Sequence, residues 1–263
     1  MFFWIYDSPA LWMALLFTTA FTVLSVVGLL VFRRRAHGWL HRDDRANEMV
    51  GLAMSSFAIL YGLLLGLLAV AAYTNYAATG DQVTREAASL ATLYRDISGL
   101  PEPTRTILQD SLRHYTREVI DVSWPAQQKG VVPETASAIL ADFNSRLQAF
   151  HPADLGEATL FAEAISQANE LVELRSQRLA NVNGGIPDIL WWVVLLGAGV
   201  NTLLLWMVNT ERHVHVVLTA LLSAFTGLVI FLIAAMDYPY RGQVSIGSEP
   251  FEQFYASAMR RAD

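Results

Sequence analysis

One apolar stretch, residues 49–78, limits what this chain can fold into more than any other part of its sequence. It reads MVGLAMSSFAILYGLLLGLLAVAAYTNYAA and contains no Asp, Glu, Lys or Arg. About twenty apolar residues are enough for a helix to cross the hydrocarbon core of a bilayer. The stretch is longer than that, so we expect a transmembrane helix with residues to spare.

The small side chains of this stretch gather on one side of the expected helix. On a helical wheel they fall close to a single line, and they are Gly51, Ser55, Ala58, Gly62, Gly66 and Ala69. The opposite side is bulky and includes Phe57, Leu60 and Leu64. Because small residues let helix backbones approach closely in a membrane, we expect this small face to pack against another helix or to line a pore.

Three more apolar blocks predict further spans, at about residues 9–32, 188–209 and 214–236. The third span begins near Trp191 and Trp192, and tryptophan is typical of the membrane–water interface. Only 16% of the residues are charged, whereas soluble domains have about a quarter. These features predict a multi-pass protein of the cell membrane, with the lipid bilayer as its first partner.

A polar segment separates the second and third spans, and its apolar residues recur at steps of three and four, which is typical of helices packed side by side. Four such stripes are present: Val83, Ala87, Leu90, Tyr94 and Ile97; Leu108, Leu112, Tyr115, Val119 and Val122; Ala136, Leu140, Phe143, Leu147 and Phe150; and Phe161, Ile165, Ala168, Val172 and Leu179. The charged residues of the last helix, among them Arg178, are interpreted as a solvated face.

The predicted fold is therefore an all-α membrane protein. It has four transmembrane helices, with a four-helix extramembrane domain inserted between spans two and three. The expected divisions are a first transmembrane pair (1–80), the helical domain (81–186), a second transmembrane pair (187–237) and a C-terminal tail (238–263).

The second span and the first helix of the polar domain are predicted to form one continuous helix. Only Thr79 and Gly80 stand between the two patterns. One glycine costs a helix about 1 kcal/mol relative to alanine, which is too little to break it.

Composition excludes several classes of function. The chain has no cysteine, so disulfides, thiolate metal sites and a cysteine nucleophile are ruled out. The net charge of −6 argues against nucleic acid as a partner. No phosphate-binding loop or catalytic motif is present, so we assign no enzymatic activity, no catalytic or metal-binding residue and no cofactor. The span cores also lack the ionisable groups that ion-coupled pumps use as relays.

The C-terminal tail begins with DYPYRG, in which Asp237 and Arg241 flank an aromatic turn stiffened by proline. We expect these two residues to anchor the last span where the chain leaves the membrane. An ion pair is the favoured interpretation, ahead of a ligand-binding role.

A series of short motifs runs from about residue 47 to residue 251. The motifs are Asn47-Glu48 with Gly51, Tyr61-Gly62 with Gly66, Glu86-Ala87-Ala88 with Tyr94, then Tyr115, Trp124-Pro125, Asp237-Tyr-Pro-Tyr-Arg-Gly242 and Glu249-Pro-Phe251. Their order resembles that of a bacterial membrane family grouped with the bestrophins as bestrophin-like. The resemblance implies four spans around a helical domain, in the bacterial inner membrane.

Through the more distant tie to the bestrophins, the resemblance also implies a ring-shaped homo-oligomer, such as a pentamer, that conducts anions. Bestrophins gate through bulky apolar side chains on span two. The corresponding span here carries Phe57 and Tyr61, so these residues and Ser56 are the candidate pore-adjacent positions.

The side of the membrane that holds the helical domain is predicted differently by two criteria. Five arginines lie in the connection at residues 33–45, and an arginine-rich connection is typically cytoplasmic. That rule, which we favour, places both termini and the helical domain outside the cytoplasm. The resemblance to bestrophins implies the reverse.

Two functions remain open from the sequence. The first is an oligomeric ion channel with the small face of span two near the pore and inorganic ions as its substrates. Hydroxyls and backbone groups can conduct ions of either sign, so anion preference follows from the resemblance alone. The second is a non-conducting membrane scaffold or sensor whose helical domain binds a partner.

Overall fold

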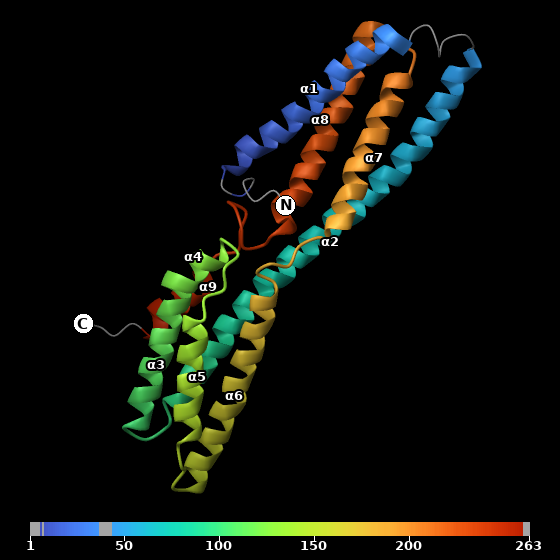
Figure 1. Ribbon diagram of the computed structural model, residues 1–263. Coiled ribbons are helices and arrows are strands. Elements are labelled where there is room, and N and C mark those ends of the chain that lie inside the picture. The colour runs from blue at the N-terminus through green and yellow to red at the C-terminus, as the bar shows by residue number, and fades with distance from the viewer. Residues whose placement is uncertain (1–5, 7, 37–43, 260–263) are drawn as a thin grey trace. The chain divides into compact units, whose positions relative to one another are not determined.

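The computed structural model describes residue 6, residues 8–36 and residues 44–259, which are helices and connecting turns without a strand (Figure 1). The elements in chain order are α1 (Ala10–Ala36), α2 (Asp44–Ile97), α3 (Thr104–Glu118), the π-helical turn η2 (Val119–Ser123), α4 (Trp124–Gln127), α5 (Thr135–Gln148), α6 (Leu155–Ala180), α7 (Asp188–Met207), α8 (Arg212–Asp237), α9 (Glu249–Phe254) and the π-helical turn η3 (Tyr255–Met259). Part of the arginine-rich connection, residues 37–43, lies outside the described residues.

Four helices of this structure are long and apolar enough to cross a membrane. They cover Ala10–Phe32, Asn47–Ile97, Asp188–Met207 and Arg212–Asp237. The four apolar helices predicted from the sequence are therefore confirmed. The second of them continues without a break past Thr79 and Gly80 to Ile97, which confirms that the span and the next helix are one.

The chain divides into two compact units. The first consists of Met1–Asn75, Gly185–Asp237 and Gly242–Val244, and the second of Tyr76–Gly184, Tyr238–Arg241 and Ser245–Asp263. Helix α2 contributes its first half to the first unit and its second half to the second.

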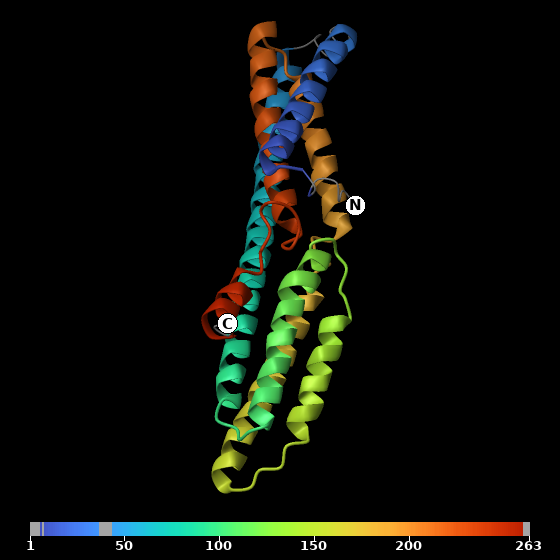
Figure 2. The ribbon, with the colours of Figure 1, turned by 90° about the vertical axis from the view of Figure 1, so that its left-hand side faces the viewer.

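In the first unit, α1 lies against α8 (Figures 1 and 2). Gly227 of α8 makes the approach close, because a side chain there would come within 2.9 Å of the backbone oxygen of Phe17. Further along α1, Trp206 of α7 lies against Gly28 and donates from Nε1 to the backbone oxygen of Ser25 at 2.9 Å. Small residues thus set the contacts of α1, as is common between membrane helices.

Helix α2 joins the first unit through one side only. Its buried residues Tyr61, Leu65, Leu68 and Ala72 pack in a cluster with Val194 and Ala198 of α7 and Ile230 and Ile233 of α8. The tyrosine hydroxyl donates to the backbone oxygen of Val194 at 3.0 Å. Its ring lies over Gly197, where an added side chain would come within 2.4 Å of it.

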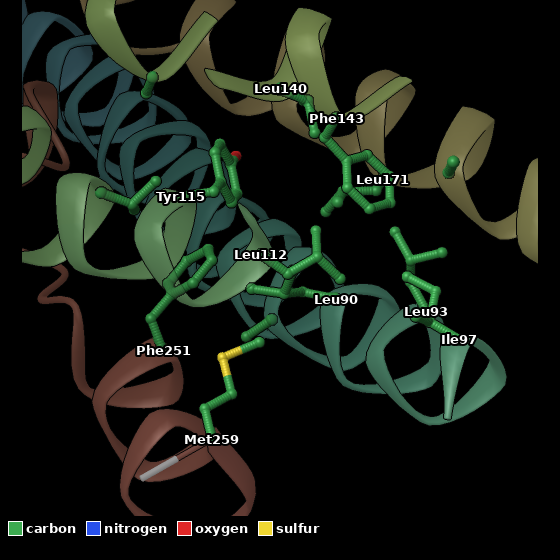
Figure 3. Close-up of a cluster of buried hydrophobic side chains, with 14 of the residues drawn as sticks. Leu90, Leu93, Ile97, Leu112, Tyr115, Leu140, Phe143, Leu171, Phe251 and Met259 are labelled. Atoms are coloured by element: carbon green, nitrogen blue, oxygen red, sulfur yellow. The ribbon is translucent and has the colours of Figure 1, made fainter. Parts of the chain in front are cut away.

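The second unit is built around a larger apolar core. Figure 3 shows side chains from α2, α3, α5 and α6 converging with Phe251 of α9 and Met259 of η3. The buried members of the predicted stripes, such as Leu90, Leu112 and Phe143, all lie in this core. The apolar periodicity therefore located most core positions of α2, α3 and α5, but of the buried residues of α6 it included only Ala168.

Two residues of those stripes are placed differently. Val172 of α6 is 40% exposed, and its neighbour Leu171 is buried instead. Val122 was expected to face the core but is 47% exposed, while Ser123 is buried. The cause is η2, since a π-helical turn takes more residues per turn than an α-helix. The inward position that follows Val119 therefore passes to Ser123.

We predict that Gly227→Ala destabilises the first unit, because the new methyl group would meet the backbone of α1. Overpacking of this kind costs about 1–3 kcal/mol of unfolding free energy. The matched control is Gly199→Ala on α7, where no atom of the described residues lies within 4 Å of an added side chain. Thermal unfolding of both variants in detergent tests this. Equal midpoints would contradict the close α1–α8 contact.

Candidate functional site

Most of the small face of α2 has no packing partner among the described residues, and only its last member, Ala69, packs against the cluster with α7 and α8. At Gly51, Gly62 and Gly66, no atom of the described residues lies within 4 Å of where a side chain would be. Ser55 donates its hydroxyl to the backbone oxygen of Gly51 at 2.9 Å, and Ala58 is exposed while Ala69 is half-buried. Within the described residues, the glycines of this face therefore have open space beside them, whereas Ala69 borders the packed side.

The side of α2 opposite its packed residues is bulky and apolar. Ile59 is 72% exposed and Leu63 is 59% exposed, and Leu67 follows one turn later and is also exposed. At 100° per residue, the small face lies about 90° from the packed side, between it and this apolar side. Helix α2 thus has a packed side, a small flank and a free apolar side.

The candidate pore-adjacent residues Phe57 and Tyr61 lie on the packed side. Their rings stack with centroids 5.8 Å apart, and both belong to the cluster with α7 and α8. Ser56, by contrast, is exposed. The structure therefore separates these three positions, and two of them contact their own subunit.

Asp237, at the end of α8, is tied to the start of α7. Its carboxylate accepts a hydrogen bond from the backbone N–H of Ile186 at 2.5 Å and another from Nε1 of Trp191 at 3.2 Å. In the second unit, the guanidinium of Arg241 lies over the ring of Tyr238, 5.4 Å from its centroid. The contacts of Asp237 join the two ends of the second transmembrane pair.

The second unit contains a buried ion pair. Arg178 of α6 is 0% exposed and binds both oxygens of Glu86 of α2, with Nη2 donating to Oε1 at 3.1 Å and Nε donating to Oε2. Its Nη1 donates to Gln127 Oε1 at 2.6 Å, and the Tyr115 hydroxyl donates to Glu86 Oε1 at 3.3 Å. The paired charges are hydrogen-bonded on several sides, as buried charges require.

Aromatic rings surround this ion pair. The Arg178 guanidinium lies 5.1 Å from the ring centroid of Trp124 and 5.9 Å from that of Phe251. Trp124 in turn meets the ring of Tyr240 edge to face, at 5.8 Å between centroids. We call the set of Glu86, Tyr115, Trp124, Gln127, Arg178, Tyr240 and Phe251 the Arg178 cluster.

Three groups of the Arg178 cluster keep their protons because their pKa values are raised. Burial opposes the charge on Arg178, but the charge and hydrogen bonds of Glu86 outweigh it and raise the pKa of Arg178 above its usual value. Burial, together with the Glu86 charge, raises the pKa of Tyr115. Burial likewise raises the pKa of Tyr240. At neutral pH the arginine is charged and both phenols are protonated.

Arg178 was interpreted from the sequence as part of a solvated helix face, and that interpretation is wrong. Its partner Glu86 is far away in the sequence, so the periodicity of α6 could not reveal the pairing. The motifs gave a usable signal instead. Glu86, Tyr115, Trp124, Tyr240 and Phe251 belong to five separate motifs, and all of them meet at this one arginine.

The hydrogen bonds and ring contacts of the Arg178 cluster hold helices of the second unit together. Among the described residues, no group of three or more His, Asp or Glu could hold a metal ion. The Arg178 cluster fastens α2, α3, α4, α6 and the tail together. The free sides of α2 are left as the surfaces available for function.

We predict that Arg178→Met destabilises the second unit by about 3–5 kcal/mol, because it leaves the Glu86 carboxylate buried without its partner. Arg146→Met is the control. It breaks a 2.6 Å pair with Asp142 that is exposed on α5, and exposed pairs contribute about 0–1 kcal/mol. Chemical unfolding in detergent compares the two. Recovery of stability in the double variant Glu86→Met with Arg178→Met would identify the unpaired charge as the cause.

The sequence model of the family described as Bestrophin-like domain matches residues 8–251 of this chain. A search of curated proteins found no match. Solved structures are similar over nearly the whole chain. One variant of a bacterial bestrophin homologue from Klebsiella pneumoniae is 13% identical, with a TM-score of 0.60, covering 95% of this chain and 97% of its own.

A second variant of the Klebsiella pneumoniae homologue is 14% identical, with a TM-score of 0.58, covering 92% of this chain and 95% of its own. A structure described only as a membrane protein is 14% identical, with a TM-score of 0.64, covering 92% and 96%. At these identities the likeness establishes the fold alone.

Proposed function

This chain belongs to the bestrophin-like family, and we propose that it forms a homo-oligomeric ring, such as a pentamer, that conducts ions through a pore lined by α2. The ring lies in the bacterial inner membrane, with residues 81–186 as a helical domain outside the bilayer. The observation that carries this proposal is the exposed apolar side of α2, with Ile59, Leu63 and Leu67, which is left uncovered by the described residues of its own subunit.

The apolar side of α2 is the best candidate for the pore wall. Ile59, Leu63 and Leu67 follow one another at four-residue spacing and are all exposed. Repeated around a ring, such side chains form an apolar constriction, and constrictions of this kind gate channels by excluding water. These three residues fit the series of bulky apolar gating side chains that the bestrophin resemblance implies. Phe57 and Tyr61 fit it less well, because both pack inside their own subunit.

The small face then lies beside the pore rather than along it. It is turned about 90° from the packed side of α2, toward the place of a neighbouring subunit in a ring. Glycine and alanine at Gly51, Ala58, Gly62 and Gly66 allow the neighbour's backbone to come close. We assign this face to contacts between subunits. Anion conduction remains the expectation drawn from the bestrophin relationship.

The first test uses the absence of cysteine from the natural chain, which makes any introduced thiol unique. Leu63→Cys, reconstituted in planar bilayers, should lose most of its current when a charged thiol reagent is added, because a charge would then stand in the constriction. Leu221→Cys on α8 is the control. Leu221 is as exposed as Leu63, at 64%, and in this arrangement it faces lipid.

Two measurements on the unmodified protein complete this test. They are its mass in detergent and its current in bilayers. A monomer, or a reconstituted protein without current at any salt concentration, would contradict the channel and favour the non-conducting scaffold or sensor. Equal responses of the two cysteine variants would remove Leu63 from the pore wall.

A second prediction concerns the small face. Gly66→Leu should prevent assembly, because a bulky side chain would hold neighbouring subunits apart, and the mass measured in detergent should fall to that of a monomer. Gly199→Leu on α7, another glycine with open space around it, should leave the mass unchanged. Intact rings with Gly66→Leu would exclude this face from the subunit contact.

A further inference from the structure

We propose that Asp81 and Arg85 of α2 set the ion preference of this channel, as two adjacent rings of opposite charge. The role rests on the proposed conduction and goes beyond it, because it names the residues that choose between anions and cations. These residues belong to the second unit, past the apolar part of α2.

In the second unit, α2 again has a packed side and a free side. Val83, Ala87 and Leu90 are buried in the core, while Asp81, Arg85 and Ala88 are exposed. No hydrogen bond or ion pair of Asp81 or Arg85 is found within the described residues. Both charges therefore stay available to a passing ion.

The other polar groups on this part of α2 are already occupied. Glu86 is buried and paired with Arg178, so its charge is cancelled inside the unit. The hydroxyls of Thr74, Thr84 and Thr92 donate to backbone oxygens of α2 itself, at 2.9 to 3.1 Å. They carry no net charge, so their effect on a passing ion is weaker than that of a charged side chain.

Farther along α2 stand the half-buried Asp96 and, in the last turn of the helix, the exposed Arg95. Arg95 is ten residues beyond Arg85, about 15 Å along the helix at 1.5 Å per residue. The partial negative charge of the helix C-terminus also offsets a cation placed there. Asp81 and Arg85 thus carry the charge nearest the membrane span on this side of α2.

The spacing of the two residues determines what they do together. They are one turn apart, so in a ring the two levels of charge lie about 6 Å from each other along the helix. This separation is less than the Debye length of about 8 Å at physiological salt. The two rings therefore partly offset each other, and the balance between them sets the preference of the natural channel for anions or cations.

The test measures reversal potentials across bilayers that separate two concentrations of KCl. Arg85→Gln should shift the ratio of chloride to potassium permeability toward potassium, and Asp81→Asn should shift it toward chloride. We expect changes of about threefold or more that grow as the salt is diluted, because the Debye length rises from about 10 Å at 0.1 M to about 30 Å at 0.01 M.

The matched controls are Asp142→Asn and Arg146→Gln. These residues form an exposed acid–arginine pair with the same four-residue spacing, but on α5. Neutralising them changes the net charge of the protein equally and should leave the permeability ratio unchanged. Arg85→Lys keeps the charge and should preserve the natural ratio.

A second measurement avoids any effect of substitution on folding. Ala88→Cys introduces a single thiol beside Arg85 on the free side of α2, and it is modified after the channel has assembled. A negatively charged thiol reagent should lower chloride permeability, and a positively charged reagent should raise it.

Opposite shifts in the two variants, enlarged at low salt and absent from the α5 controls, establish the charge rings. Currents with an unchanged permeability ratio in all variants would overturn this assignment while leaving the channel itself in place. A natural protein that passes no current would overturn the proposed function, and the charge rings with it.

Discussion

The buried pair of Glu86 and Arg178 is the interaction on which the second unit depends. It brings one charge from α2 and one from α6 into a site closed by Trp124, Tyr115 and Phe251. A buried charge without a partner would cost several kcal/mol, so packing registers that separate Glu86 from Arg178 are disfavoured. The pair therefore fixes which side of α2 faces the core, and hence which side is left free.

The choice of packed side determines which surfaces of α2 are left exposed. In the first unit Tyr61 and Leu65 turn the helix toward α7 and α8, and in the second unit Glu86 and Leu90 turn it toward the helical core. Among the described residues, Ile59, Leu63 and Leu67 in the first unit and Asp81, Arg85 and Ala88 in the second are left exposed. A long unbroken helix with a persistent free side is well suited to assembly around an axis, because every copy presents the same surface.

Much of this architecture could be predicted from the sequence, since it depends on local periodicity. Apolar length identified the four spans, and steps of three and four located most core residues of α2, α3 and α5. Arg178 could not be found this way, because a charged residue on an amphipathic helix looks solvated until its partner is known. Val122 was misplaced because a π-helical turn leaves no mark on the pattern. The packed side of α2 escaped prediction because leucine occurs all around that helix.

The burial of the C-terminal residues affects the order in which this protein can fold during its synthesis. Phe251 and Met259 lie in the core of the second unit, beside Tyr115 and Leu112 (Figure 3). Those partners are translated more than a hundred residues earlier, and α7 and α8 are translated in between. The ribosome thus delivers two membrane helices before it delivers the side chains that close this core. Until then the nascent unit exposes an apolar opening, which a chaperone or the membrane surface must cover.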